Sequence, residues 1–144
     1  ETAEPQAVVI NAGVANAATG GSGIADAEQT AAVTASALSL TVEEVVVLST
    51  GVIGVPLPMD RVLAGVQAAS ALLDPDGGDA AATAILTTDR WPKQATVASD
   101  GFVVGGMAKG AGMIHPRLAT MLAIWPVSRT ALRYDACSEL SCAS

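Results

Sequence analysis

Two short aliphatic runs most constrain the fold of this sequence. Ala7–Asn11 and Val45–Leu48 are rich in valine and bounded by polar or glycine-containing segments, so both are predicted to be buried strands. The sequence is 51% apolar but only 3% aromatic, so its core must be built from alanine, valine, leucine and isoleucine. Because such small side chains let elements pack closely, we expect one compact domain with a layered α/β body.

Helical patterns lie between and after these strands. Asp26 with Gln29 three residues later forms a plausible capping pair, which would start a helix after a glycine-rich loop over residues 12–23. Pro58 occupies a natural first helical position for a second helix. A shorter helix is expected over Asp79–Leu86. The apolar stripe predicted for the second helix consists of Met59, Val62, Leu63, Val66, Leu72 and Leu73.

The second half of the sequence contains a strong hairpin signal. Asp100-Gly101 lies between Gln94–Ser99 and Phe102–Val104, two segments with strand-like composition. Strands and helices are therefore mixed, and at least one strand pair is antiparallel. There is no internal repeat, and the linkers are too short to divide the chain into two domains.

Charge and cysteine usage exclude several classes of function. A formal charge of -7 argues against nucleic-acid binding, which needs a concentrated basic face. No apolar stretch reaches the roughly 18 to 20 residues that span a bilayer, and the acidic opening is unlike a signal peptide. Cys137 and Cys142 have no metal-ligand partners at useful spacing, so no metal site is predicted and a cytoplasmic location is expected. The first residue is not methionine, which suggests a fragment or a processed chain.

The segment Lys109–Leu122 is the best candidate for chemistry. A threonine hydroxyl is a weak nucleophile unless a base lies beside it, and the α-amine of Thr120 becomes such a base if the chain is cut after Ala119. The Ala119–Thr120 bond is therefore a candidate self-cleavage site. The alternative is an ordinary glycine-rich turn leading into a buried strand. A phosphate loop is excluded, because the lysine precedes the glycines instead of following them.

Other residues suggest supporting roles. Ser49-Thr50-Gly51 follows the second predicted strand, where backbone N–H groups and a hydroxyl could form an oxyanion hole, although a plain turn is the alternative. Lys109 lies among glycines in an apolar neighbourhood and could bind a carboxylate. Thr87-Thr88-Asp89 fits either a helix end or the wall of a polar pocket. The single histidine, His115, cannot form a metal site alone.

Taken together, four motifs resemble the ornithine acetyltransferase (glutamate N-acetyltransferase) family of arginine biosynthesis. They occur in the family's order and at similar spacing, over roughly residues 7–123. The motifs are Asn11–Gly20; Ser49–Gly54 with Leu57–Met59; Ala84–Asp89 with Pro92-Lys93; and Gly105–Ile114 continuing through Pro116 to Ala119–Leu122.

This resemblance implies a layered mixed sheet with helices, the ornithine acetyltransferase-like (DmpA/ArgJ-like) fold, incomplete here. It implies self-cleavage between Ala119 and Thr120, after which Thr120 carries acetyl from N-acetylornithine to glutamate. Thr50 and Gly51 match the oxyanion-hole pair, while Thr87, Lys109 and Thr120 match substrate-binding positions. The implied partner is a beta chain from the same precursor, in a hetero-oligomer of alpha and beta chains. No cofactor is implied, although some members also accept acetyl-CoA as a donor.

The family pattern is expected to cover only part of the chain. The resemblance assigns residues 1–124 to a family-like α/β domain and leaves 125–144 as a divergent tail, truncated or frame-shifted. Family members also have a segment before the position of Ala7 and a long second chain. We therefore expect an incomplete pocket and impaired activity. Two alternatives remain open: a related N-terminal-nucleophile aminopeptidase or hydrolase, and a non-catalytic fragment.

Overall fold

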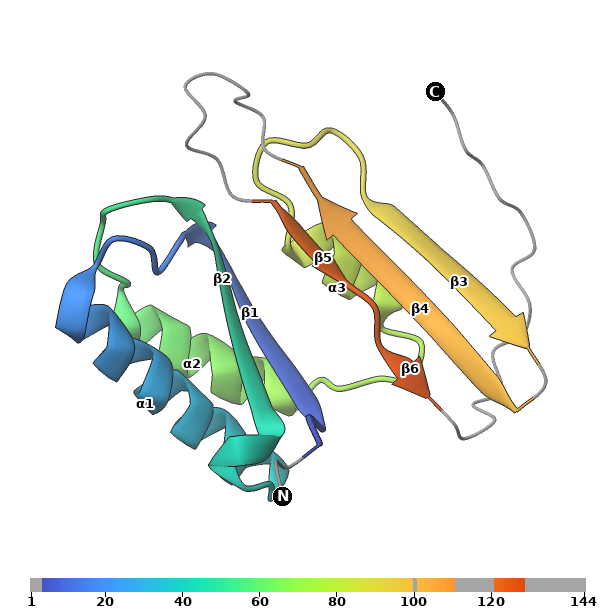
Figure 1. Ribbon diagram of the computed structural model, residues 1–144, viewed down its shortest axis with the longest axis horizontal. Helices are drawn as coiled ribbons and strands as arrows, with labels where there is room; N and C mark the ends of the chain where they lie inside the picture. The colour runs from blue at the N-terminus through green and yellow to red at the C-terminus, as the bar shows by residue number, and fades with distance from the viewer. Residues whose placement is uncertain (1–3, 100, 111–120, 129–144) are drawn as a thin grey trace.

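The computed structural model describes residues 4–99, 101–110 and 121–128. Strands β1 (Ala7–Val14) and β2 (Val45–Val52) form a two-stranded parallel sheet, paired from Ala7 with Val45 to Val14 with Val52 (Figure 1). Parallel strands require a crossover connection, and helix α1 (Gly20–Leu38) with the 3₁₀ turn η1 (Val42–Glu44) provides it. Both predicted strands are confirmed in position, and each extends beyond its aliphatic run. The prediction that these runs are buried is wrong, because their residues are only half-buried or, as at Val8, exposed.

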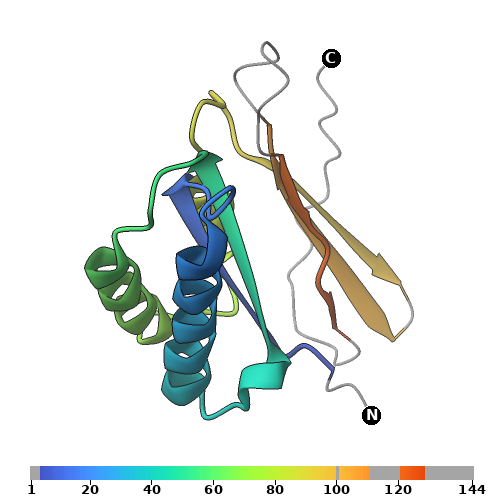
Figure 2. The ribbon, with the colours of Figure 1, turned by 60° about the vertical axis from the view of Figure 1, so that its left-hand side comes forward.

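Helix α1 and helix α2 (Met59–Ser70) cover the same face of this sheet, as Figure 2 shows. The buried side of α1 is built from small residues, including Thr30 and Thr34. Each of these hydroxyls donates a hydrogen bond to a carbonyl one turn earlier, of Asp26 at 2.7 Å and of Thr30 at 2.8 Å. The helix backbone thus satisfies both buried hydroxyls. Within the described ranges, no helix is both long and apolar enough to cross a membrane.

A second sheet is antiparallel. The predicted hairpin is confirmed: β3 (Lys93–Ser99) pairs with β4 (Phe102–Lys109), and Ser99 lies opposite Phe102. On its other edge, β4 pairs with β5 (Leu122–Ile124) and β6 (Val127–Ser128). Helix α3 (Gly78–Ala84) packs against β3 and β4, two residues shorter than predicted at its C-terminal end.

The elements form successive layers, with α1 and α2 outermost, the β1–β2 sheet next and the antiparallel sheet beyond it (Figures 1 and 2). The predicted layered α/β class is confirmed, and its parallel and antiparallel strands belong to two separate sheets. The core is aliphatic, as the composition requires. Its buried apolar residues are Ala15, Ala31, Ala35, Leu57, Val66, Ala82, Ile85 and Ile124.

The predicted start of the first helix is wrong. Helix α1 begins at Gly20 rather than at Asp26, and no side chain caps it. A Cβ atom on Gly23 would overlap the side chains of Thr19 and Asn16, and the Asn16 amide donates a 2.6 Å hydrogen bond to the Gly23 carbonyl. Gly23 therefore allows the first helical turn to pack onto the preceding loop, whereas Gly20 and Gly21 have open space around them.

The predicted stripe on the second helix is wrong at its end. Helix α2 stops at Ser70, so Leu72 and Leu73 fall in the following turn, where they are 78% and 71% exposed. Val66, in contrast, lies inside α2 and is buried, as predicted. Helical spacing correctly identified the face but could not identify the residue at which the helix ends.

Candidate active site

The candidate residues come from two separate sheets, at the strand ends that lie at one end of the molecule. The carboxyl ends of β1 and β2, the end of β4 and the start of β5 lie at the same end in both ribbon views (Figures 1 and 2). The loop between α3 and β3 lies there as well. Residues widely separated in sequence are thereby brought to a common edge, which is where open α/β arrangements place functional groups.

Thr50 is the most buried candidate. It lies inside β2, opposite Ala12 of β1, so the strand continues past its aliphatic run and the alternative of a plain turn at Thr50 is wrong. Its side chain is 0% exposed, and its Oγ1 atom has no hydrogen-bond partner among the described residues. Leaving a buried hydroxyl unpaired costs about 1–3 kcal/mol. A polar atom kept in that state is a candidate for binding a group that arrives from outside the fold.

Gly51 is fixed by its contact with the neighbouring strand. Its φ is +133°, and it lies opposite Gly13, whose φ is +117°. A Cβ atom on Gly51 would come within 2.6 Å of the Val14 nitrogen and closer still to the Gly13 carbonyl. Only glycine fits such a position, because an L side chain would both clash and require a disfavoured backbone conformation. The backbone around Thr50 is therefore held in one specific shape.

Side chains reinforce this shape. The Ser49 hydroxyl donates to the Asn11 side-chain oxygen, and the Asn11 amide donates to the Val14 carbonyl at 2.7 Å. The first bond joins the two strands, and the second joins two residues of β1 that lie on either side of Gly13. Since a useful oxyanion hole must be preorganised, this bracing suits the predicted role of Thr50 and Gly51.

Lys109 is a buried cation at the end of β4. Its side chain is 2% exposed, and its ammonium donates a 2.6 Å hydrogen bond to the Thr87 hydroxyl. An ammonium has three donors, and Thr87 is its one hydrogen-bond partner in the described part of the chain. Burial lowers the pKa of Lys109, an effect that the Asp89 carboxylate opposes. The structure thus joins two of the predicted substrate-binding residues.

Asp89 is a further functional candidate; the sequence left Thr87-Thr88-Asp89 as either a helix end or the wall of a polar pocket. Its Oδ2 accepts a 2.6 Å hydrogen bond from the Gly110 N–H, and its other oxygen pairs with the Lys93 ammonium. The bond from Lys93 and that from Gly110 lower the pKa of Asp89, partly opposed by burial. The spacing of Asp89 and Lys93 could have suggested their ion pair. Nothing local in the sequence indicates the bond to Gly110, which is 21 residues away.

The remaining predicted residues lie outside the described ranges. Ala119, Thr120 and His115 belong to residues 111–120, and both cysteines belong to residues 129–144. The meeting of Thr120 with Thr50 and Lys109 therefore stays a prediction. In the described ranges, no three histidine, cysteine, aspartate or glutamate side chains are grouped so that they could hold a metal ion.

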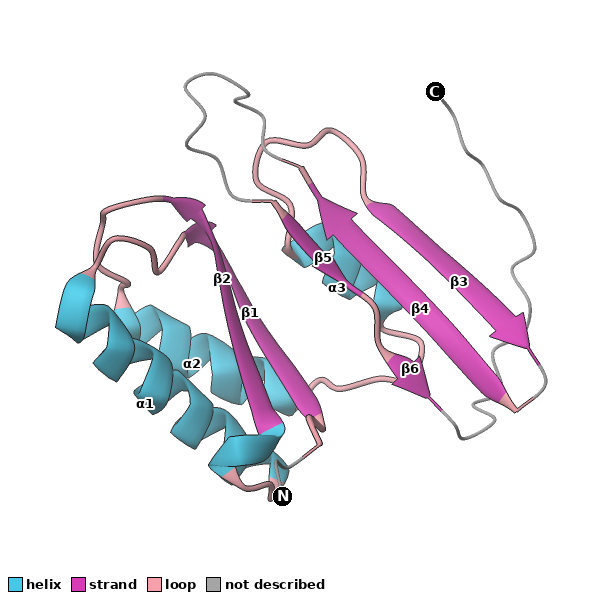
Figure 3. Cartoon of the chain, viewed as in Figure 1, coloured by secondary structure: helices cyan, strands magenta, loops and turns pink. Residues whose placement is uncertain are grey.

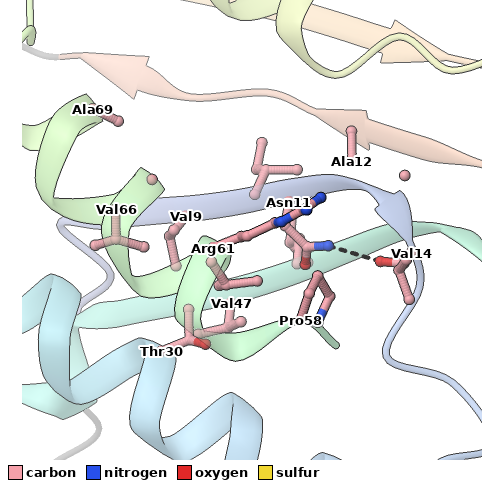
Figure 4. A pocket seen from close by; sticks show the side chains of 15 residues that line it. Val9, Asn11, Ala12, Val14, Thr30, Val47, Pro58, Arg61, Val66 and Ala69 are labelled. Atoms are coloured by element: carbon pink, nitrogen blue, oxygen red, sulfur yellow. Dashed lines mark hydrogen bonds between the residues drawn. The ribbon is translucent and has the colours of Figure 1, made fainter. Parts of the chain in front are cut away.

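A pocket of about 420 Å³ lies elsewhere, between α2 and the helix-covered face of the β1–β2 sheet (Figure 4). Aliphatic side chains such as Val9, Val47 and Val66 form much of its wall, with Asn11 and Arg61 on one side. None of Thr50, Gly51, Thr87 and Lys109 lines it. We interpret it as incomplete packing beneath α2, because its lining is of core type and it bears none of the candidate groups.

Comparison with known proteins places this chain in a family. The model of the ArgJ family matches residues 1–131. The chain belongs to the ArgJ family. Among curated relatives, the arginine biosynthesis bifunctional protein ArgJ of Symbiobacterium thermophilum is 56% identical over 126 residues, covering 85% of this chain and 31% of the relative. The ArgJ protein of Streptomyces coelicolor is 52% identical over 124 residues, covering 86% of this chain and 32% of the relative.

Solved ArgJ structures share the fold. The ornithine acetyltransferase of Mycobacterium tuberculosis, crystallised with ornithine, is 46% identical, with a TM-score of 0.71 over 80% of this chain and 62% of that one. The ArgJ protein of Bacillus halodurans is 39% identical, with a TM-score of 0.63 over 80% of this chain and 61% of that one. The family predicted from the four motifs is confirmed.

The chain spans about a third of the length of its curated ArgJ relatives. The family match continues past Ile124 to residue 131, and β6 pairs Val127 and Ser128 with β4. The division into a family-like domain ending at residue 124 and a divergent tail from residue 125 stays a prediction.

Proposed function

We propose that this chain forms part of an acetyltransferase of arginine biosynthesis, which moves an acetyl group from N-acetylornithine to glutamate. Membership of the ArgJ family supports this, as do relatives named as bifunctional proteins of arginine biosynthesis. The structural relative named ornithine acetyltransferase was crystallised with ornithine, which supports an amino-acid substrate for the same site.

The observation that carries the proposal is the buried ammonium of Lys109. A buried cation is costly unless paired, and among the described residues Thr87 is the one hydrogen-bond partner for the three donors of the Lys109 ammonium. An amino-acid α-carboxylate would place a negative charge directly on this ammonium and accept its remaining donors. N-acetylornithine and glutamate both carry such a group, so one lysine can hold the donor and the acceptor in turn.

Thr50 and Gly51 are proposed to stabilise the reacting oxygen. The Thr50 hydroxyl, which has no partner among the described residues, can donate to the oxyanion that forms when a carbonyl carbon is attacked. The glycine contact with β1 holds this part of the backbone in place, so that reaction requires no rearrangement. We assign these two residues to the oxyanion hole, as the motif predicted.

Thr120 is proposed to be the nucleophile in two reactions. In self-cleavage its hydroxyl oxygen attacks the Ala119 carbonyl, the Ala119–Thr120 peptide bond breaks, and water hydrolyses the resulting ester. The released α-amine of Thr120 is then the general base. In acetyl transfer it takes the hydroxyl proton while the oxygen attacks the acetyl carbon, and the proton passes to the departing ornithine amine. The glutamate amine next attacks the acetyl carbon, the bond from that carbon to the Thr120 oxygen breaks, and a proton from the glutamate amine passes through the Thr120 α-amine to restore the hydroxyl.

Position along the chain supports this role. Lys109 pairs with Leu122 across β4 and β5, and Thr120 precedes Leu122 by two residues. The substrate anchor and the nucleophile are therefore tethered closely at the same end of the sheet. The acetyl group travels on Thr120, so we propose no cofactor and no metal, with acetyl-CoA as an alternative donor. A beta chain from the same precursor, assembled with this alpha-chain region in the cytoplasm, would supply the rest of the pocket.

Intact-mass analysis of the complete gene product tests the proposal. We expect two chains separated between Ala119 and Thr120, and a single uncut chain for the Thr120→Ala variant. The cut wild-type protein should transfer acetyl from N-acetylornithine to glutamate. Hydrolysis of N-acyl or peptide substrates without transfer to glutamate would instead favour the N-terminal-nucleophile hydrolase. An uncut wild-type chain would favour a non-catalytic protein.

A further inference from the structure

Asp89 connects the loop before β3 to the last described residue before segment 111–120. One carboxylate oxygen accepts the Gly110 N–H at 2.6 Å, and the other pairs with Lys93 at the start of β3. Lys109, the neighbour of Gly110, is held through its side chain by Thr87 of the same loop. Two consecutive residues of the chain are thus fixed by one loop, one through its side chain and the other through its backbone.

The hydrogen bond from Gly110 to Asp89 lies just beyond the end of the strand pairing in the antiparallel sheet. The pairing of β3 with β4 ends at Lys93 and Ala108, and the pairing of β4 with β5 ends at Lys109 and Leu122. Gly110 lies beyond both ladders. Its hydrogen bond to Asp89 is therefore the first restraint on the chain after the strand pairing ends. Losing this bond should remove none of the hydrogen bonds between the strands.

The restraint is close to the proposed cleavage site in chain terms. Residues 111–120 connect Gly110 to Met121 and contain the Ala119–Thr120 bond. The chain leaves β4 after Lys109 and re-enters the sheet at Leu122, directly opposite Lys109. The bond from Gly110 to Asp89 therefore restrains one end of the connection that contains Ala119–Thr120. Small displacements of reacting groups reduce rates strongly, by about a hundredfold for 1 Å.

We propose that Asp89 is a positioning residue for self-cleavage at Ala119–Thr120. It acts through Gly110 and does not touch the reacting atoms. This inference rests on the proposed function, since it requires the Ala119–Thr120 bond to be cut. Lys93 has a secondary part: its ammonium orients the carboxylate so that the second oxygen faces Gly110.

The test measures the first-order rate of precursor cleavage in the complete gene product, at temperatures where circular dichroism shows each variant to be folded. Asp89→Ala removes the acceptor, and loss of a charge-assisted hydrogen bond should slow cleavage about tenfold or more. Asp89→Asn alone would place an amide beside the Lys93 ammonium. The matched pair is therefore Asp89→Asn/Lys93→Met, which keeps an acceptor oxygen, and Asp89→Ala/Lys93→Met, which does not.

We expect the first double variant to cleave within about threefold of wild type and the second to stay about tenfold slower or more. Asp79→Ala is the control for a lost side-chain bond onto β3, because Asp79 accepts from Gln94 and has no described contact with Gly110. Its cleavage rate should equal that of wild type. Equal rates for the two double variants would overturn the proposal, as would an Asp89→Ala protein that is unfolded at every temperature.

Failure of the proposed function has a different signature. If wild-type protein is never cut at Ala119–Thr120, self-processing itself is wrong. If wild type is cut and Asp89→Ala is cut as fast, the function stands and the role of Asp89 is wrong.

Discussion

Replacing Gly51 with alanine should strongly destabilise this fold. The new Cβ would lie within 2.6 Å of the Val14 nitrogen and closer to the Gly13 carbonyl, whereas real Cβ contacts essentially never fall below 3.0 Å. These atoms are backbone of the paired strand, not the end of a flexible side chain. Strands β1 and β2 must therefore separate locally, which breaks part of their ladder.

The cost has two parts. Forcing an extra carbon into a close-packed site costs about 1–3 kcal/mol. Holding alanine at a φ of +133° costs a further 1–3 kcal/mol or so. Their sum, roughly 2–6 kcal/mol, compares with a typical total stability of about 5–15 kcal/mol. We expect the variant to lose a large fraction of its free energy of unfolding, and with it the support of Thr50.

Alanine substitutions at two other glycines separate the cost of the steric clash from the cost of the backbone conformation. Gly54 has a φ of +79° but no atom within 4 Å of a built Cβ, so Gly54→Ala pays the conformational cost alone. Gly65 lies inside α2 with open space around it, and Gly65→Ala should stabilise the protein by about 0.5–1 kcal/mol. Urea denaturation of the three variants measures each free energy of unfolding. If Gly51→Ala costs no more than Gly54→Ala, the clash does not exist and the argument fails.

Further predictions concern the buried polar groups. Thr50→Val should raise the free energy of unfolding by about 1 kcal/mol in urea titrations, because it removes an unpaired buried hydroxyl. The same variant should lower the rate of acetyl transfer about 10²–10³-fold. Lys109→Met should leave stability unchanged or higher while raising KM for N-acetylornithine about 30-fold or more. Since burial lowers the pKa of Lys109 from 10.5, the unfolded chain binds more protons between the folded pKa and 10.5. The free energy of unfolding should therefore rise with pH over that interval, and Lys109→Met should lack this rise.

Local patterns in the sequence predicted the elements that depend on neighbouring residues. The Asp100-Gly101 signal located the hairpin because a two-residue turn fixes the register of both strands, here with Ser99 opposite Phe102. The aliphatic runs located β1 and β2 because a short run of valine and other apolar residues, bounded by polar or glycine-containing segments, favours a strand. The start of α1 was missed because a glycine-rich segment usually signals a loop, whereas here Gly23 lies inside the helix and packs against Asn16.

Contacts across long sequence separations could not be predicted from these patterns. Periodicity identifies a face but not the partner of that face, so neither the bond of Lys109 to Thr87 nor that of Gly110 to Asp89 has a local signature. The four motifs identified Thr50, Thr87 and Lys109 as site residues only through their resemblance to a family. The structure adds that Thr87 and Lys109 touch, and that Thr50 is buried without a partner among the described residues.

The buried polar residues fall into two groups, those whose hydrogen bonds the described fold satisfies and those whose hydrogen bonds it does not, and this division supports the candidate site. Among the described residues four are buried: Thr30, Thr34, Thr50 and Lys109. Thr30 and Thr34 are satisfied by carbonyls of their own helix, so the fold explains them. Within the described ranges, the Thr50 hydroxyl has no partner and the Lys109 ammonium has one partner for three donors, so the groups described there do not offset the cost of burying either. Their strands belong to separate sheets and end on the same side of the molecule (Figure 3). A hydroxyl donor and a cation left unsatisfied there match the two charges of an acyl-transfer reaction on an amino acid, the oxyanion and the α-carboxylate.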